Sequence, residues 1–288
     1  MAPELARYPQ KHMPMCSLRL LLFIAILATG PLAHTQSIPY GNNPATGHYF
    51  NVGDAKMYYE IYGQGQPLVM LHGGVYGYID EFESLIPKLA EHYQVICIAT
   101  RGHGKSEIGT QPFTYRGRAE DAFKVIRSIT SDSVTVVGFS EGGFTGLELA
   151  ALHPELVKRL VAMGVGNYPI DHSKDLHYTP EELMKEDSAF FAGRLKLMPE
   201  PVRWREFLNK SNDLYNNDQM GVETFSKIKC PVLVMAGEKD SYNHLDNVLI
   251  CARAIPDHQL SIIPGCDHVI LYCNFPAVWE AMKPFVIR

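Results

Sequence analysis

The sequence predicts an α/β fold, in which a mostly parallel, twisted β-sheet has helices on both faces and a helical lid is inserted into the core. The main observation is that short apolar runs alternate, from about Tyr49 onward, with segments whose apolar residues recur at helical spacing. This alternation is typical of βαβ units and of a covered parallel sheet. The chain of 288 residues, 46% of them hydrophobic, is also long enough to bury a sizeable core.

The expected elements follow one another in a regular order. A hairpin that turns at Gly53 and Asp54 opens the fold, because a glycine and an aspartate separate two strand-like runs there. Six further strands are expected where apolar and β-branched residues cluster, at 67–71, 94–99, 133–139, 159–165, 231–237 and 259–265. Helices are expected where the apolar spacing is helical, at 81–92, 119–129, from residue 141 onward, at 245–254 and at 276–287.

One interval breaks this rhythm and divides the core. Residues 36–166 and 227–288 are expected to form its two parts, whereas residues 167–226 are rich in aromatic, Met, Lys and Glu residues. A helix should begin there at Thr179, followed by Pro180 and by Glu182, which completes a capping box. Open α/β sheets bind ligands at the carboxyl ends of their strands, where this insertion departs, so we predict a lid. The alternative is that this segment forms an additional helical packing layer that has no role at the site.

The N-terminal residues 1–35 have the order of a secretory signal peptide. Lys11 and Arg19 precede an apolar block at 20–28, and small and polar residues follow. The block is shorter than the roughly 20 residues that a membrane-spanning helix needs, so no stable span is expected. We therefore predict a secreted or periplasmic protein, which would be membrane-associated if the segment stays uncleaved.

Charge and cysteine content exclude several other classes of protein. The formal net charge is -5 and there is no Lys/Arg-rich run, which disfavours binding to nucleic acid. No Cys/His spacing is typical of a zinc site, so neither a metal nor a cofactor is expected. The odd number of cysteines beyond the leader leaves at least one unpaired within the chain, and the sequence does not assign the pairs: Cys97, Cys230, Cys251, Cys266 and Cys273.

The stretch "VGFSEGG" places Ser140 between a strand and a helix. Gly138 and Gly142 complete the pattern G-x-S-x-G, which holds a serine hydroxyl at the tip of a very sharp turn. Glycines permit such a turn because they lack a Cβ atom. The strand before the serine and the helix after it are the context that this pattern requires, so Ser140 is the candidate nucleophile.

A serine nucleophile needs a base, and the base needs an orienting acid. His268 and Asp240 each follow a late core strand, in the chain order that this type of site uses. Glu238 is the second candidate for the acid, whereas Asp267, adjacent to the histidine, is expected to be a solvated loop charge.

The oxyanion of acyl transfer needs backbone amide donors. One should be the amide of Glu141, directly after the nucleophile. The other should come from the glycine-rich "HGGVYG", where Gly73, Gly74 and Val75 are available and Gly74 is our choice.

Together these motifs resemble the serine α/β-hydrolase superfamily over about residues 49–288. The "SEGG" and "GEKD" segments are most similar to the biphenyl-hydrolase-like group, which includes the valacyclovir hydrolases, and to carboxylesterases. The resemblance implies a Ser-His-Asp hydrolase without a cofactor. It also implies that Glu141 could bind an α-amino group of the substrate, although an acid at a helix N-terminus is also favoured by the helix dipole.

The predicted function is therefore hydrolysis of a small carboxylic ester through an acyl-enzyme, with a small-molecule ester as the partner. Four aromatic residues are candidates for shaping the acyl or alcohol pocket: Tyr76, Tyr78, Trp204 and Tyr215. Two alternatives stay open. The same triad could act on a C–C, thioester, lactone, amide or aminoacyl ester bond, or the chain could be a non-catalytic ligand-binding member of the fold. The oligomeric state is not predicted.

Overall fold

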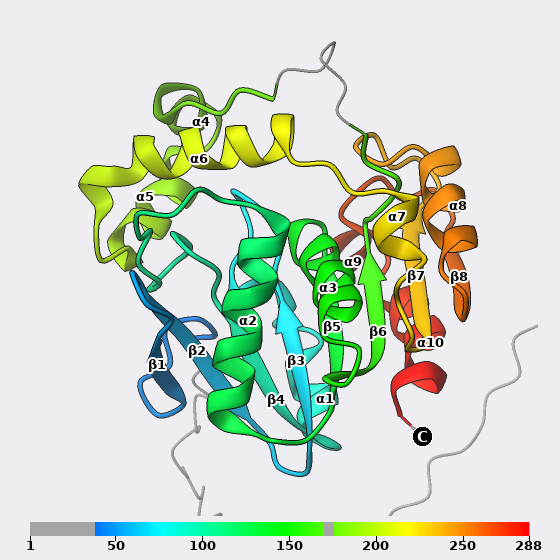
Figure 1. The fold of residues 1–288 in the computed structure, drawn as a ribbon. Coiled ribbons are helices and arrows are strands. Elements are labelled where there is room, and N and C mark those ends of the chain that lie inside the picture. Colours follow the sequence, from blue (N-terminus) through cyan, green and yellow to red (C-terminus); the bar gives the residue numbers. More distant parts are fainter. Residues whose placement is uncertain (1–37, 170–175, 288) are drawn as a thin grey trace, which may run out of the picture. The chain divides into compact units, whose positions relative to one another are not determined.

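The computed structural model describes residues 38–169 and 176–287. The predicted signal peptide, residues 1–35, lies outside these ranges. Within them the chain forms an eight-stranded sheet in the order β1-β2-β4-β3-β5-β6-β7-β8 (Figure 1). Strand β2 is antiparallel to β1 and β4, and all other neighbouring strands are parallel. The predicted α/β fold class is confirmed.

All the predicted strands are present, with ends that shift by at most two residues. Their bounds are β1 (Gly47–Asn51), β2 (Lys56–Tyr62), β3 (Gln66–Leu71), β4 (Tyr93–Ile98), β5 (Val134–Phe139), β6 (Val157–Met163), β7 (Val232–Gly237) and β8 (His258–Ile263). The hairpin of β1 and β2 turns at Gly53 and Asp54, as expected.

The helices predicted around the core are present in the described residues, except the one expected over 81–92. The observed bounds are α1 (Ile86–Ala90), α2 (Tyr115–Ile129), α3 (Glu141–Leu152), α4 (Pro180–Glu186), α5 (Ser188–Leu197), α6 (Trp204–Asn217), α7 (Val222–Phe225), α8 (Leu245–Ala254), α9 (Ile270–Cys273) and α10 (Phe275–Val286), with 3-10 turns η1 (Ile79–Phe82) and η2 (Pro201–Arg203).

The prediction of one helix over 81–92 is wrong. The segment contains the end of η1, a short break and then α1, which has Pro87 in its first turn. Proline suits the first turn of a helix because its missing N–H has no partner there, but it interrupts a helix that is already under way.

The central parallel strands of the sheet send alternate side chains into two separate cores. On β3, Val69 and Leu71 pack into the core beneath α2, α3 and α8. Their neighbours Leu68 and Met70 pack into the second core, beneath α1 and α10. This period-two alternation between two buried faces explains why the parallel strands read as continuous apolar runs.

The segment between β6 and β7 contains α4, α5, α6 and α7. Figure 1 shows α4, α5 and α6 above the carboxyl ends of the strands. The predicted start of α4 is confirmed: the Thr179 hydroxyl accepts a hydrogen bond from the Glu182 amide at 3.2 Å and donates one to the Glu182 carboxylate at 2.8 Å. Asp187 then separates α4 from α5 and caps α5 by accepting from the Phe190 amide at 2.9 Å.

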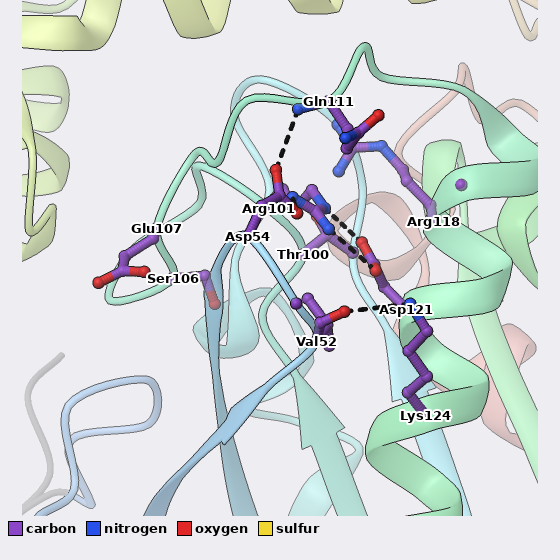
Figure 2. Close-up of polar contacts among 12 residues, drawn as sticks. Val52, Asp54, Thr100, Arg101, Ser106, Glu107, Gln111, Arg118, Asp121 and Lys124 are labelled. Carbon is purple, nitrogen blue, oxygen red and sulfur yellow. Dashed lines mark hydrogen bonds and ion pairs between the residues drawn. The ribbon is translucent and has the colours of Figure 1, made fainter.

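A buried arginine joins three distant parts of the core (Figure 2). Arg101, in the loop after β4, donates to both carboxylate oxygens of Asp121 on α2. Its Nη1 atom lies 2.8 Å from Oδ1 of Asp54, at the turn of the β1–β2 hairpin. Arg101 is only 6% exposed, so loss of either carboxylate would leave a buried charge poorly compensated. The "RGHG" segment thus has a structural function.

None of the helices within residues 38–169 and 176–287 has both the length and the apolar character that crossing a membrane requires.

Candidate active site

Ser140 lies in a strained turn between β5 and α3. Its φ is 51° and its ψ is -120°, a conformation that non-glycine residues rarely adopt. The turn also needs its glycines. A Cβ atom on Gly138 would lie 2.3 Å from the Gly142 carbonyl oxygen, and one on Gly142 would lie 2.0 Å from that of Leu71. The chain therefore holds one hydroxyl at the end of a buried strand at a cost in backbone strain.

His268 lies between Ser140 and Asp240. The Nε2 atom of the imidazole is 2.9 Å from Ser140 Oγ, and Nδ1 is 3.0 Å from Asp240 Oδ2. The Asp240 carboxylate is buried and also accepts from the amides of Tyr242 and Asn243, at 3.0 and 2.8 Å. These amides fix the orientation of the Asp240 carboxylate. The structure thus brings Ser140, His268 and Asp240, the three predicted residues, into successive hydrogen bonds.

The other candidates for the acid bind elsewhere. Glu238 accepts from the amide of Gly265 at 2.8 Å. Asp267 accepts from the Ser241 amide and hydroxyl and from the backbone amide of His268, at 2.7 to 2.9 Å, so it shapes the loop around the histidine. The acid in contact with the imidazole is therefore Asp240.

A disulfide encloses the histidine loop. Cys266 and Cys273 are bonded to each other, so the segment 267–272, which contains His268, is a closed loop. Cys97, Cys230 and Cys251 are free and buried. The pairing that the sequence left open thus joins the two cysteines that flank the candidate base.

The candidate oxyanion donors differ in whether their backbone amides are already hydrogen-bonded. The amide of Gly73 is already used, since it donates to Glu81 Oε2 at 2.7 Å. The amides of Gly74 and Glu141 make no hydrogen bond to the described part of the chain, and both residues line the same cavity as Ser140. The amide of Val75, the third candidate in this loop, also makes no hydrogen bond to the described residues and lies in the same cavity lining. The contacts therefore rule out Gly73 and leave Gly74, our choice, and Val75 as the possible partners of Glu141.

Two groups that hold the Gly73–Gly74 loop were not identified from the sequence. Glu81 is one, and its burial raises the pKa of the carboxyl to about 7, although the Gly73 amide opposes the shift. The other is His72, which donates from Nδ1 to the Gly73 carbonyl at 2.7 Å and accepts from the Thr100 amide at 3.0 Å. Burial lowers the pKa of His72 to about 3, so this imidazole is neutral. The sequence signal that could have identified Glu81 and His72 is that each is an ionisable residue beside apolar residues.

The cavity beside Ser140 has a volume of about 190 Å³ and a largely aromatic wall. The predicted pocket residues Tyr76 and Tyr215 line it, as do six aromatic residues that we did not predict: Tyr115, Phe139, Phe144, Tyr168, Tyr178 and Tyr242. Tyr168 and Tyr178 come from the segment between β6 and β7 and Tyr242 from the loop after β7, where spacing along the chain carries no periodic signal.

The predictions for Tyr78 and Trp204 are wrong, because neither residue lines this cavity. Tyr78 is fully buried, and its hydroxyl donates to the Gly41 carbonyl oxygen at 2.6 Å. Trp204 begins α6 and packs against Phe191, with ring centroids 5.8 Å apart. Both are packing residues.

The Glu141 side chain has two partners within the protein. Its Oε1 atom lies 3.1 Å from Arg118 Nε, and its Oε2 atom accepts from the Tyr215 hydroxyl at 2.7 Å. Burial raises the pKa of Glu141, while Arg118 and Tyr215 oppose the shift. These partners weigh against the expectation that the carboxylate binds an α-amino group. Glu141 is also the first residue of α3. This agrees with the alternative reading of the sequence, in which the helix dipole favours an acid at the N-terminus.

Within the described ranges, no cluster of three or more His, Cys, Asp or Glu side chains could hold a metal ion.

Comparison with known proteins places this chain in a family. Residues 66–203 match the model of the alpha/beta hydrolase fold. The 2-hydroxy-6-oxo-6-(2'-aminophenyl)hexa-2,4-dienoic acid hydrolase of Metapseudomonas resinovorans is 28% identical over 76% of this chain and 83% of its own length. A Haemophilus influenzae protein that carries the provisional name esterase/lipase is 33% identical over 77% of this chain and 80% of its own length.

A solved structure gives the same result. The serine hydrolase CarC, described as involved in carbazole degradation, superimposes with a TM-score of 0.69 at 26% identity, and the match covers 83% of this chain and 98% of CarC. The chain belongs to the alpha/beta hydrolase superfamily, because it matches the family model and is 33% identical to the Haemophilus influenzae relative over most of both chains.

Proposed function

We propose that this chain is a serine hydrolase that cleaves small carboxylic esters through an acyl-enzyme. The observation that carries the proposal is the hydrogen-bond chain from Asp240 through His268 to Ser140, at the wall of an aromatic cavity. A protein that only bound ligands would have no use for an imidazole held between a carboxylate and a serine at a strained turn.

In the first half-reaction, the Oγ atom of Ser140 attacks the ester carbonyl carbon while Nε2 of His268 takes the hydroxyl proton. Asp240 holds the proton on Nδ1, which keeps Nε2 free to accept, and it stabilises the imidazolium that forms. The tetrahedral oxyanion accepts hydrogen bonds from the amides of Gly74 and Glu141. Collapse of this intermediate expels the alcohol, which leaves with the proton from His268.

In the second half-reaction, water attacks the acyl-enzyme and gives up a proton to Nε2 of His268. The same two amides stabilise the second oxyanion, and the proton returns to Ser140 as the acid leaves. The helix dipole of α3, whose first residue is Glu141, points its positive end at this position.

The cavity limits the size of the substrate. A cavity of about 150 Å³ in another protein is large enough for benzene, and the volume here is about 190 Å³. Its aromatic wall favours an apolar or aryl group. We therefore expect esters with one ring or a short acyl chain, and weak turnover of long-chain lipids.

The experiment compares wild-type protein with Ser140→Ala on p-nitrophenyl acetate and with a fluorophosphonate label. We expect rapid turnover and labelling for the wild type and loss of both in the variant, with an unchanged melting temperature. Undiminished turnover by the variant would refute Ser140 as the nucleophile.

Hydrolysis of a carbon–carbon bond is the second candidate reaction. The Metapseudomonas resinovorans relative is named for an acid that carries a ketone and a diene but no ester group. Hydrolysis of such a compound breaks a bond between two carbon atoms. A panel that sets aryl esters against aryl dienoic keto acids separates the two reactions by their ratio of kcat/KM.

Export to an oxidising compartment remains part of the proposal. The Cys266–Cys273 disulfide supports it, because disulfides persist in secreted and periplasmic proteins and are rare in the cytosol. Cell fractionation and N-terminal sequencing of the recovered protein test it, and a cytosolic protein with an intact N-terminus would contradict it.

A further inference from the structure

The hydroxyl of Tyr215 touches both residues whose amides are proposed to bind the oxyanion. It donates to Glu141 Oε2 at 2.7 Å. It also lies so close to Gly74 that a Cβ atom built on that glycine would be 2.1 Å from the hydroxyl oxygen. Tyr215 belongs to α6, in the inserted segment, whereas Gly74 and Glu141 belong to the core. A single lid atom therefore contacts both sides of the candidate oxyanion site.

The carboxylate that receives this hydrogen bond is held from its other side by Arg118. The Nε atom of Arg118, on α2, lies 3.1 Å from Glu141 Oε1, and the two side chains are 1% and 2% exposed. The guanidinium also lies over the ring of Phe113, 4.5 Å from its centroid. Glu141 is thus fixed between a cation from α2 and a hydroxyl from α6, in a site with little water to replace either partner.

The position of Glu141 makes this arrangement matter for chemistry. Glu141 directly follows Ser140, so restraining its side chain also restrains the first backbone amide of α3. The close approach of the Tyr215 hydroxyl limits the movement of Gly74 toward α6, and so restrains the opposite amide by packing. Oxyanion donors stabilise a transition state only when they are held in place beforehand, and small displacements reduce that stabilisation strongly.

We propose that Tyr215 is a positioning residue that couples the α6 lid to the oxyanion-binding amides of Gly74 and Glu141. The inference rests on the proposed function, since it concerns the same serine chemistry. It assigns to the lid a second role besides covering the cavity: when α6 is in place, its hydroxyl sets the spacing of the two donors. It also explains the glycine at 74, because any side chain there would collide with the Tyr215 hydroxyl.

The first test is Tyr215→Phe, which removes the hydroxyl and keeps the ring in the cavity wall. We expect kcat for p-nitrophenyl acetate to fall about tenfold while KM changes less than about twofold; this is smaller than the roughly 100-fold or greater loss on removing an oxyanion donor itself. Asp213→Asn, an exposed position on the same helix, is the control and should leave both constants unchanged.

A ligand comparison distinguishes positioning from simple pocket shape. Phenylboronic acid forms a tetrahedral adduct with an active serine and places an oxygen in the oxyanion site, whereas phenol occupies only the cavity. In Tyr215→Phe the inhibition constant of phenylboronic acid should rise about tenfold, in parallel with the fall in kcat, while that of phenol stays the same. Equal weakening of both ligands, or no weakening of either, would overturn the inference.

A double variant gives an independent result. Gly74→Ala alone should lose most activity, because its Cβ atom meets the Tyr215 hydroxyl at 2.1 Å, whereas the next nearest ring atom is at 3.1 Å. Removing the hydroxyl should therefore restore several-fold activity to Gly74→Ala when it is combined with Tyr215→Phe. Strictly multiplicative losses would contradict the contact. A wild-type protein that fails to react with fluorophosphonate would overturn the proposed function itself.

Discussion

The Nε2 atom of His268 lies 2.9 Å from the Oγ atom of Ser140, although 128 positions separate the two residues in the chain. The serine follows β5 and the histidine follows β8, and both strands end at the same edge of the sheet. The parallel topology thus brings the base to the nucleophile, and its partner on the other side, Asp240, follows β7 at that edge.

Asp240→Asn should lower kcat by about 10⁴-fold with little change in stability. The amide nitrogen of asparagine would favour the tautomer that carries its proton on Nε2, which cannot accept the serine proton. Steady-state kinetics and thermal melting measure the two effects. Glu238→Gln is the matched control, because that carboxylate contacts the Gly265 amide and should leave kcat near the wild-type value. Equal losses in both variants would contradict the assignment of the acid.

Ser140→Gly should be more stable than Ser140→Ala by about 1 kcal/mol, although neither has a nucleophile. Alanine keeps the cost of a φ of 51°, whereas glycine adopts that conformation freely at some cost in unfolded-state entropy. Urea denaturation of the two variants measures the difference. The same pair at Ser128, inside α2, should show the opposite sign, because glycine disfavours a helix. A glycine variant less stable than alanine at position 140 would argue against strain there.

Replacing both Cys266 and Cys273 by serine should lower the free energy of unfolding by about 2 kcal/mol, given the short loop that the disulfide closes. It should also lower kcat several-fold, because the loop carries His268. Dithiothreitol should reproduce the loss of activity in wild-type protein and leave the double variant unaffected. Cys251→Ala removes a buried free thiol and serves as the control. Full wild-type activity after complete reduction would contradict a role for the disulfide in positioning the histidine.

The sequence was informative wherever local physics determines the structure. Alternating apolar runs located the strands of the sheet, and the glycines around Ser140 located the turn, because only glycine tolerates the contacts that Gly138 and Gly142 make there. The order of Asp240 and His268 after successive strands identified the rest of the site. Each of these features is written in a short stretch of sequence.

The remaining features depend on long-range packing. Whether Tyr78 or Tyr215 reaches the cavity is decided by where η1 and α6 pack, and neither residue has a local sequence that distinguishes a wall position from a core position. The pairing of Glu141 with Arg118 joins α3 to α2, and the hydrogen bond from the Gly73 amide to the Glu81 carboxylate joins the loop after β3 to η1. Such contacts have no spacing rule, so they became visible only in three dimensions.

The substitution Glu81→Gln should raise the free energy of unfolding, relative to the wild type, by more at high pH than at low pH. The carboxyl of Glu81 has its pKa raised to about 7 by burial, from an ordinary value near 4.5 in the unfolded chain. The folded protein therefore holds this proton more tightly, and its stability falls as the pH rises from about 4.5 to 7. Glutamine still accepts from the Gly73 amide but does not ionise.

The free energy of unfolding of Glu81→Gln relative to wild type should therefore increase by about 1–3 kcal/mol between pH 4.5 and pH 8. Urea denaturation at both pH values measures this difference. Glu83→Gln, at an exposed position two residues away, controls for the loss of one negative charge and should show a much smaller change with pH. If the two variants responded to pH alike, desolvation of the Glu81 carboxyl would not be the cause. The Glu81 carboxyl, which accepts from the Gly73 amide, would then be ionised in the folded protein between pH 4.5 and pH 8 at little cost in stability.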